Sequence, residues 1–268
     1  MAGAPFRHGH AVMCLGQMVS TLAILALVGA GALAGVASTV ASLASVVSYP
    51  VLLALGLPPV SANVTNTVAL VFTGAGAAAG SRRELAGQGR LVRRLGALTA
   101  AGGAAGAAVL LTTPADAFIR VVPVLIGGAS LLLLIQPRIS ALEPAPGRGH
   151  RAVHGAALFA VAMYVGYFGA AAGIMLLVVL SSMIDEPLVR TNAVKNALSG
   201  MANATAAVCF ALFGEVRWEL VVPLAAGFLI GGWIGPAIAR RIPAGPFRIM
   251  IGLAGIGLAI RLGISAYR

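Results

Sequence analysis

The sequence contains few charged residues. Asp, Glu, Lys and Arg make up 9% of its 268 residues, whereas they make up about 25% of an average soluble chain. Hydrophobic residues make up 59%, and the mean hydropathy is +0.98. A chain of this composition cannot cover its surface with polar groups, so its outer apolar surface must face lipid. The composition excludes a soluble domain and predicts an all-α integral membrane protein with several crossings.

Acidic residues are especially scarce. The chain has seven, and each lies where an apolar run stops: Glu84, Asp116, Glu143, Asp185, Glu186, Glu215 and Glu219. Carboxylates within the membrane are the usual proton carriers of pumps and transporters. Their absence from the apolar runs argues against a relay of that kind.

Cysteine is nearly absent as well. Cys14 and Cys209 lie in apolar surroundings without the spacing of a metal or redox motif, so we interpret them as packing residues and expect no cofactor or metal. The net charge of +11 can indicate a nucleic-acid partner. Because the arginines cluster between apolar runs, where basic residues orient membrane proteins, we expect the lipid bilayer and no nucleic acid as a partner. A homo-oligomer stays open.

Long uncharged stretches mark the expected membrane spans, since a helix needs about 20 apolar residues to cross a bilayer. The first stretch, residues 8–81, can hold three crossings, with breaks near Gly29 to Gly35 and at Pro58-Pro59. Residues 152–184 are too many for one upright helix and few for two, and glycines 166, 169 and 173 offer breaks there. The other stretches bring the total to eight to ten spans: residues 95–115, 121–137, 196–214, 220–239 and 249–260.

Two parts of the chain repeat one another. Ala62–Thr67 aligns with Thr191–Asn196, an offset of 129 residues (62 to 191). The same offset relates two further pairs of motifs, and a fourth pair follows with a slip of two: Gly102-Gly103-x-x-Gly106 with Gly231-Gly232-x-x-Gly235, Pro114-Ala115-x-x-Phe118 with Pro243-Ala244-x-x-Phe247, and Gly87–Arg90 with Gly214–Arg217. We therefore expect two homologous transmembrane repeats, residues 1–137 and 153–268, joined by a polar linker at residues 138–152.

The arginines indicate the relative orientation of these repeats. In the first half they crowd the loop at residues 81–94, whose counterpart at residues 214–219 has only Arg217. The turn at residues 113–118 has none, yet its counterpart carries Arg240 and Arg241. Because cytoplasmic ends attract basic residues, this exchange favours inverted repeats, with broken helices at the repeat interface.

Lys195 is the only lysine of the chain. It lies about 12 Å along a predicted helix that starts at Pro187, well inside a hydrocarbon layer of about 30 Å. A lysine at that depth costs about 2.5–3.5 kcal/mol on insertion scales, so it is expected to face a cavity or a partner. The apolar runs contain no acidic partner for it. Its helix also carries a polar stripe at i, i+4, i+7 and i+11: Asn192, Asn196, Ser199 and Asn203.

A buried ammonium without a buried anion, surrounded by amides and hydroxyls, predicts a site for an anion supplied from outside. The helix starts after Pro58-Pro59 and Pro187 would add favourable dipoles. Broken segments at residues 41–57 and 166–182 would bring backbone N–H groups to the same place. The expected substrate-binding residues are Asn63, Thr65, Asn66, Asn192, Lys195, Asn196, Ser45 and Ser48.

Other interpretations stay open. Stripes of Asn and Ser also bind transmembrane helices to one another, and Lys195 could extend to the membrane surface. An intramembrane hydrolase would use a serine such as Ser45 or Ser48, activated by Lys195. An anion channel or a non-transporting scaffold is a further alternative to a carrier.

The sequence resembles the sulfite exporter TauE/SafE family, also described as toluene sulfonate uptake permeases. Tyr49–Pro59 continuing into Ala62–Asn66 is similar to that family's first signature. Gly166–Gly169 with Gly173, followed by Thr191–Asn196, is similar to the second. Where the family has a glycine cluster, this chain has Ser42, Ser45 and Ser48. The resemblance covers most of residues 25–262 and implies a bacterial cytoplasmic-membrane transporter, not an enzyme, for sulfite, sulfonates or related sulfur-containing anions.

Overall fold

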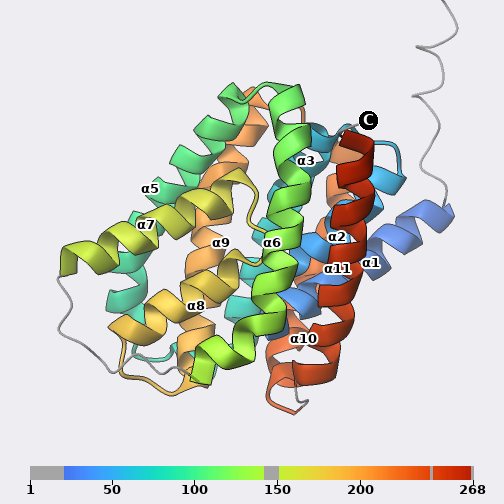
Figure 1. The fold of residues 1–268 in the computed structure, drawn as a ribbon. Helices are drawn as coiled ribbons and strands as arrows, with labels where there is room; N and C mark the ends of the chain where they lie inside the picture. Colours follow the sequence, from blue (N-terminus) through green and yellow to red (C-terminus); the bar gives the residue numbers. More distant parts are fainter. Residues whose placement is uncertain (1–20, 142–150, 242–243, 267–268) are drawn as a thin grey trace, which may run out of the picture.

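The computed structural model describes residues 21–141, 151–241 and 244–266. Within these ranges the chain forms eleven α-helices and no strand, as the apolar runs predict. Figure 1 shows the helices gathered into one bundle. In chain order they are α1 (Thr21–Ala41), α2 (Ala44–Ala54), α3 (Pro59–Gly80), α4 (Arg82–Leu85), α5 (Gly89–Thr112), α6 (Ala115–Ala141), α7 (Arg151–Tyr167), α8 (Ala172–Met183), α9 (Leu188–Phe213), α10 (Trp218–Ala239) and α11 (Ala244–Ala266).

Prolines set the starts of the two helices that carry most of the polar residues. Pro58 precedes the first residue of α3, which is Pro59, and Pro187 precedes the first residue of α9. Proline suits these positions because the first turn of a helix has no partner for its N–H groups. Both starts agree with those predicted from the sequence.

Two breaks interrupt the bundle inside the apolar segments. Ser42, between α1 and α2, has a φ of 62°. Between α7 and α8, Gly169 and Ala171 have φ values of 73° and 54°. Residues other than glycine rarely adopt this left-handed backbone conformation, because it costs them about 1–2 kcal/mol each. The breaks fall within the segments for which the sequence predicted them.

The two broken segments enter the bundle from opposite ends. Helix α1 runs parallel to α10, since Gly31 lies against Gly227 and Gly35 against Gly231. Helix α7 runs parallel to α5, with contacts that progress from Phe159 near Gly102 to Tyr167 near Gly106. Helices α3 and α9 are antiparallel, since Gly74 lies against Gly200 and Val64, near the start of α3, lies against Gly214, just after the end of α9. Helices α5 and α10, which follow them, therefore start at opposite ends. The α1–α2 and α7–α8 hairpins therefore point toward one another through the bundle.

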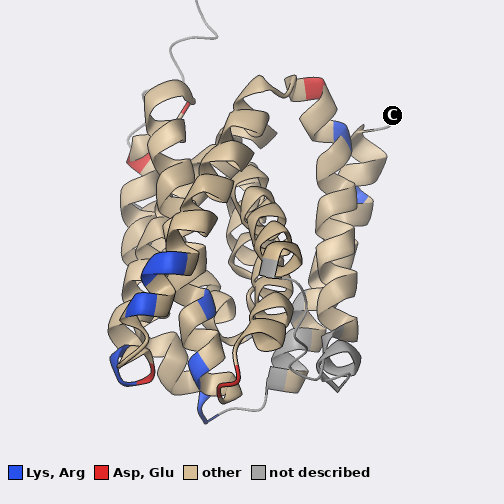
Figure 2. Cartoon of the chain, turned by 90° about the vertical axis from the view of Figure 1, so that its left-hand side faces the viewer, with Lys and Arg blue, Asp and Glu red and all other residues tan. Residues whose placement is uncertain are grey.

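Five helices are long and apolar enough to cross a bilayer: residues 23–40 of α1, α5, residues 115–135 of α6, α9 and α10. Many large apolar side chains on the outside are exposed, such as Leu33, Val124, Leu212 and Trp233. In Figure 2 the charged residues lie mainly toward the two ends of the bundle, and most basic ones lie in its lower half. This distribution suits a lipid environment.

Helices α6 and α11 lie side by side (Figure 1). They are antiparallel, since Gly255 lies against Ser130 and Gly263 against Pro123. Helix α6 continues through Ala141 and α7 starts at Arg151, so most of the linker predicted at residues 138–152 lies outside the described residues.

Candidate functional site

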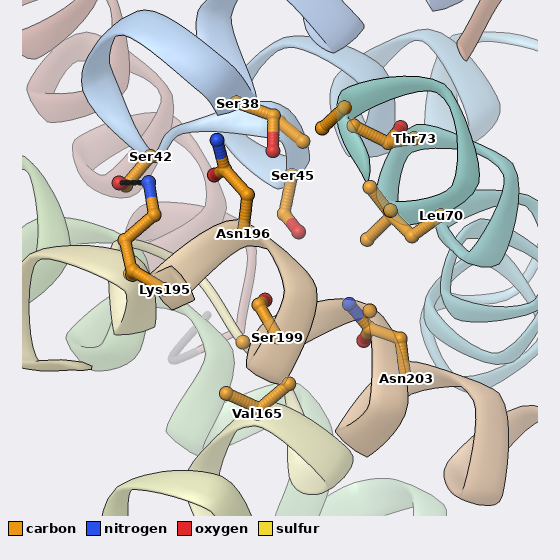
Figure 3. A pocket seen from close by; sticks show the side chains of 16 residues that line it. Ser38, Ser42, Ser45, Leu70, Thr73, Val165, Lys195, Asn196, Ser199 and Asn203 are labelled. Carbon is orange, nitrogen blue, oxygen red and sulfur yellow. Dashed lines mark hydrogen bonds between the residues drawn. The ribbon is translucent and has the colours of Figure 1, made fainter. Parts of the chain in front are cut away.

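A small polar cavity lies where the α1–α2 break meets α3, α9 and the α7–α8 break (Figure 3). Its volume is about 40 Å³, which is room for roughly three water molecules or one compact ion. Polar side chains from four helices (α1, α2, α3 and α9) and from the first break reach it. They are Ser38, Ser42, Ser45, Thr73, Lys195, Asn196, Ser199 and Asn203.

Lys195 is the one basic side chain of this cavity. It is 2% exposed, and its Nζ donates a hydrogen bond of 2.7 Å to Ser42 Oγ (Figure 3). In the part of the chain that the structure describes, Lys195 forms no ion pair with an acidic residue. The side chain therefore turns toward the break between α1 and α2, and its charge is solvated by a neutral hydroxyl.

Two polar atoms of the cavity wall lack partners. Asn196 Nδ2 and Thr73 Oγ1 are buried and form no hydrogen bond. Buried polar groups are nearly always hydrogen-bonded, so each unpaired one calls for an explanation. Both atoms belong to side chains that line the cavity. A ligand with oxygen atoms would satisfy them.

Asn63 and Asn192 support the two breaks from outside the cavity wall. Asn63 Nδ2 donates to the carbonyl oxygen of Tyr167 at the end of α7, at 2.9 Å. Asn192 Nδ2 donates to the carbonyl oxygen of Thr39 in the last turn of α1, at 3.2 Å. The last carbonyl groups of a helix have no partner within that helix. These two amides supply one at each broken helix.

Asn66 organises the serines of α2. Its Oδ1 accepts a hydrogen bond of 2.6 Å from Ser48, and its Nδ2 donates to Ser45 Oγ at 3.3 Å. Of these three residues only Ser45 reaches the cavity. Thr65 lies closer to the end of the bundle, where its Oγ1 accepts a hydrogen bond of 3.2 Å from the backbone N–H of Arg217.

The predicted site residues thus fall into two groups. Lys195, Asn196 and Ser45 line the cavity, whereas Asn63, Thr65, Asn66, Asn192 and Ser48 form the shell that holds α1, α2, α3 and α7 around it. For the hydrolase alternative, the lysine contacts Ser42 and not Ser45 or Ser48.

Some cavity residues were not among those predicted. Ser38 and Ser42 precede the predicted Ser45 in the sequence by seven and three residues, the spacing of one helix face, although the break at Ser42 interrupts the helix there. Ser199 and Asn203 belong to the polar stripe of α9. Thr73 reaches the cavity through the crossing of α3 and α9, which the sequence does not reveal.

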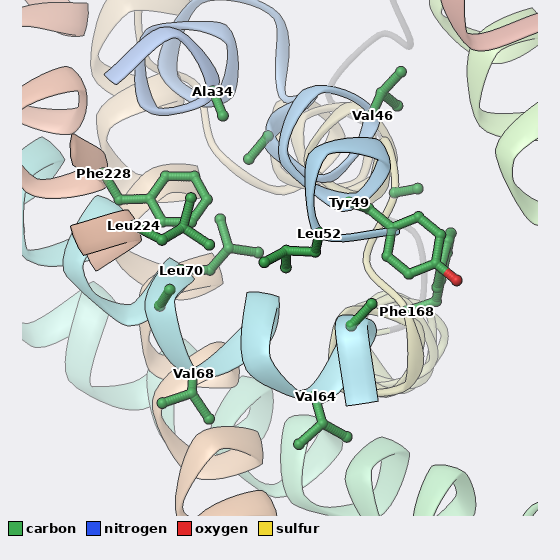
Figure 4. Close-up of a cluster of buried hydrophobic side chains, with 14 of the residues drawn as sticks. Ala34, Val46, Tyr49, Leu52, Val64, Val68, Leu70, Phe168, Leu224 and Phe228 are labelled. Atoms are coloured by element: carbon green, nitrogen blue, oxygen red, sulfur yellow. The ribbon is translucent and has the colours of Figure 1, made fainter. Parts of the chain in front are cut away.

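Aromatic residues fix the α7–α8 break against α2 and α6. Phe168 is 2% exposed, and its ring packs edge-on against Tyr49 of α2 with centroids 5.6 Å apart (Figure 4). It also meets Phe118 of α6 at 6.1 Å. Such edge-on pairs contribute about 0.5–1.5 kcal/mol beyond the area they bury. These contacts hold Phe168, next to the cavity-lining Gly169, in a packed apolar core.

An all-helical bundle with lipid-facing apolar surfaces, broken helices and a buried polar cavity at the breaks defines a multi-pass membrane transporter. The chain belongs to the Sulfite exporter TauE/SafE family, which it matches over residues 27–262. The resemblance seen in its motifs is thereby confirmed. It is a multi-pass protein of the cell membrane.

The chain is also similar to two proteins named as probable membrane transporters. The probable membrane transporter protein ORF9 of Sinorhizobium sp is 24% identical over 233 residues, which cover 86% of this chain and 88% of the relative. The probable membrane transporter protein YfcA of Escherichia coli K12 is 27% identical over 235 residues, covering 84% and 82%. No solved structure matches the chain.

Proposed function

We propose that the protein is a secondary carrier that moves a small sulfur-containing oxyanion, such as sulfite or a sulfonate, across the bacterial cytoplasmic membrane. The observation that carries the proposal is Lys195, a buried side chain that has a hydroxyl and no carboxylate as its partner among the described residues. A bound anion would stabilise an ammonium in such a place, because a buried charge requires a partner of opposite sign.

The remaining cavity groups suit the oxygens of such an anion. Asn196 Nδ2 can donate only, and the hydroxyl of Thr73 can donate as well. Both lack partners, and several serine hydroxyls lie around the same space. The volume of about 40 Å³ favours a compact inorganic anion, and an aromatic sulfonate would require the cavity to expand.

We further propose that the fold consists of two inverted repeats, residues 1–137 and 153–268, with the cavity at their interface. Three helix starts of the first half recur 129 residues later (59 to 188) in the second: Pro59, Gly89 and Ala115 against Leu188, Trp218 and Ala244. The left-handed residues Ser42 and Ala171 have the same separation. So have Asn63 and Asn192, which cap the two broken helices. The opposite entry of the two hairpins supports inversion.

In this proposed architecture ten segments lie in the membrane. Eight are long helices, and α2 and α8 are too short to cross alone. Arginines crowd the end of the bundle where α3 and α10 finish, among them Arg82, Arg83, Arg90, Arg93, Arg94, Arg190, Arg240 and Arg241. The positive-inside bias makes this end cytoplasmic.

The proposal is tested by anion flux in vesicles that contain the purified protein. Lys195→Met should abolish the uptake of radiolabelled sulfite or sulfate, because it removes the one charge of the cavity. Arg94→Met, which removes a charge from the exposed surface of α5, should leave uptake unchanged. Normal uptake by Lys195→Met would refute the proposal. Saturation and counterflow would separate a carrier from a channel.

A further inference from the structure

A second cavity, which shares no lining residue with the cavity at Lys195, lies at the arginine-rich end of the bundle. We propose that it binds the phosphodiester headgroup of an anionic lipid. Its volume is about 300 Å³. The end of α3, the short helix α4 and the residue after α10 form its wall, through Ala79, Gly80, Arg82, Arg83, Glu84 and Arg240.

The charges of this cavity are unbalanced. Arg240 donates a hydrogen bond of 2.7 Å to Glu84 Oε1 and forms an ion pair with it. Arg82 and Arg83 are exposed, and neither side chain has a hydrogen bond or ion pair within the described residues. Three arginines and one glutamate thus line the cavity. The two unpaired ones are suited to phosphate, whose oxygens match the planar donors of arginine.

Glu84 holds the cavity in shape and does not neutralise it. Its Oε2 is buried without a partner, so the carboxylate binds Arg240 through a single oxygen. Its backbone carbonyl accepts a hydrogen bond from Arg190 Nε at 3.3 Å, which fastens α4 to the start of α9. These contacts hold α4 in place between the ends of α3 and α10 and the start of α9, and so fix the wall of the cavity.

The surface beside the cavity favours a lipid over a soluble phosphate compound. Trp233 is 61% exposed and lies seven residues before Arg240, on the same face of α10. Tryptophan collects at the level of lipid headgroups. Ile230, 46% exposed, continues this face toward the membrane interior, where an acyl chain would lie. Basic pockets between transmembrane helices on the cytoplasmic side commonly bind anionic headgroups.

The test is the melting temperature of the purified full-length protein in neutral detergent, titrated with phosphatidylglycerol, phosphatidylcholine or inorganic phosphate. Phosphatidylglycerol should raise the melting temperature in a saturable manner, since a ligand of the folded state stabilises it. Phosphatidylcholine and phosphate should not. An equal shift with inorganic phosphate would overturn the lipid assignment, and no shift with either would overturn the site.

Variants separate this cavity from the general charge of the surface. Arg82→Gln/Arg83→Gln should weaken phosphatidylglycerol binding at least about tenfold, because each lost phosphate contact removes a charge-assisted hydrogen bond. Arg93→Gln/Arg94→Gln removes the same charge from the exposed surface of α5 and should bind as the wild type does. Equal weakening by both pairs would refute a specific site. Trp233→Ala should weaken lipid binding as well. Lys195→Met should retain it, so the outcome does not depend on the transport proposal.

Discussion

Lys195 Nζ and Ser42 Oγ are 2.7 Å apart, although their residues are separated by 153 positions in the chain. The contact joins α9 to the break between α1 and α2, where Ser42 has a φ of 62°. A hydroxyl solvates the ammonium without cancelling its charge. An arriving anion can therefore replace Ser42 as the partner of Lys195 and gain the stronger, charge-assisted interaction.

Substitutions of Ser42 should reveal both roles of this residue. Ser42→Ala removes a partly buried hydrogen bond to a charged group, and such bonds contribute about 1.5–3 kcal/mol. Ser42→Gly loses the same bond but removes the backbone strain of the left-handed conformation. That conformation costs a residue other than glycine about 1–2 kcal/mol. We expect Ser42→Gly to melt at a higher temperature than Ser42→Ala.

Ser38, one turn earlier in the regular helix α1, is the control for that comparison. There glycine should be worse than alanine by about 0.5–1 kcal/mol, because it loses more conformational freedom on folding. The same order at both positions would contradict the proposed role of the backbone at Ser42. Thermal unfolding of the four variants in one detergent gives the measurement.

The sequence predicted the helix starts and breaks that surround this site better than it predicted which residues line the cavity. Pro58 and Pro187 mark helix starts through local rules, and the glycines of residues 166–173 mark a break. The depth of Lys195 follows from its distance to Pro187. Which polar residue faces the cavity depends instead on how α3 crosses α9. Asn66 and Thr73 belong to one helix, yet Thr73 reaches the cavity and Asn66 contacts the serines of α2.

A carboxylate placed beside Lys195 should block anion transport. Ser199 lines the cavity four residues after Lys195, a spacing at which side chains meet on a helix. In Ser199→Asp the ammonium acquires a fixed partner, and an anion loses a contact of about 1.5–3 kcal/mol. Uptake at low anion concentration should fall at least about tenfold.

Two variants control for the loss of the hydroxyl and for the added charge. Ser199→Ala should retain most transport. Ser182→Asp adds the same charge near the end of α8, away from the cavity, and should also retain it. Comparable uptake by Ser199→Asp and Ser199→Ala in vesicles would argue against direct binding of the anion to Lys195.

The asparagines at the two breaks should matter for stability. Asn63→Ala and Asn192→Ala each leave a helix-end carbonyl without its donor, which costs about 1–3 kcal/mol when the group is buried. Both variants should melt at lower temperature than the wild type. Asn203→Ala is the matched control, because the amide of Asn203 forms no hydrogen bond within the described residues. An equal loss in all three variants would contradict the capping role.

The crossing of α3 and α9 should tolerate no added side chain. A Cβ at Gly74 would lie 2.6 Å from the Cα of Gly200, a backbone atom that cannot move without separating the helices. Gly74→Ala should therefore lower the melting temperature and reduce transport, because the two helices carry opposite walls of the cavity. Gly128→Ala in α6 meets no atom within 4 Å and should leave stability unchanged or raise it by up to about 1 kcal/mol through its higher helix propensity. If Gly74→Ala melts and transports as Gly128→Ala does, the close crossing seen here is not the one that surrounds the site in the membrane.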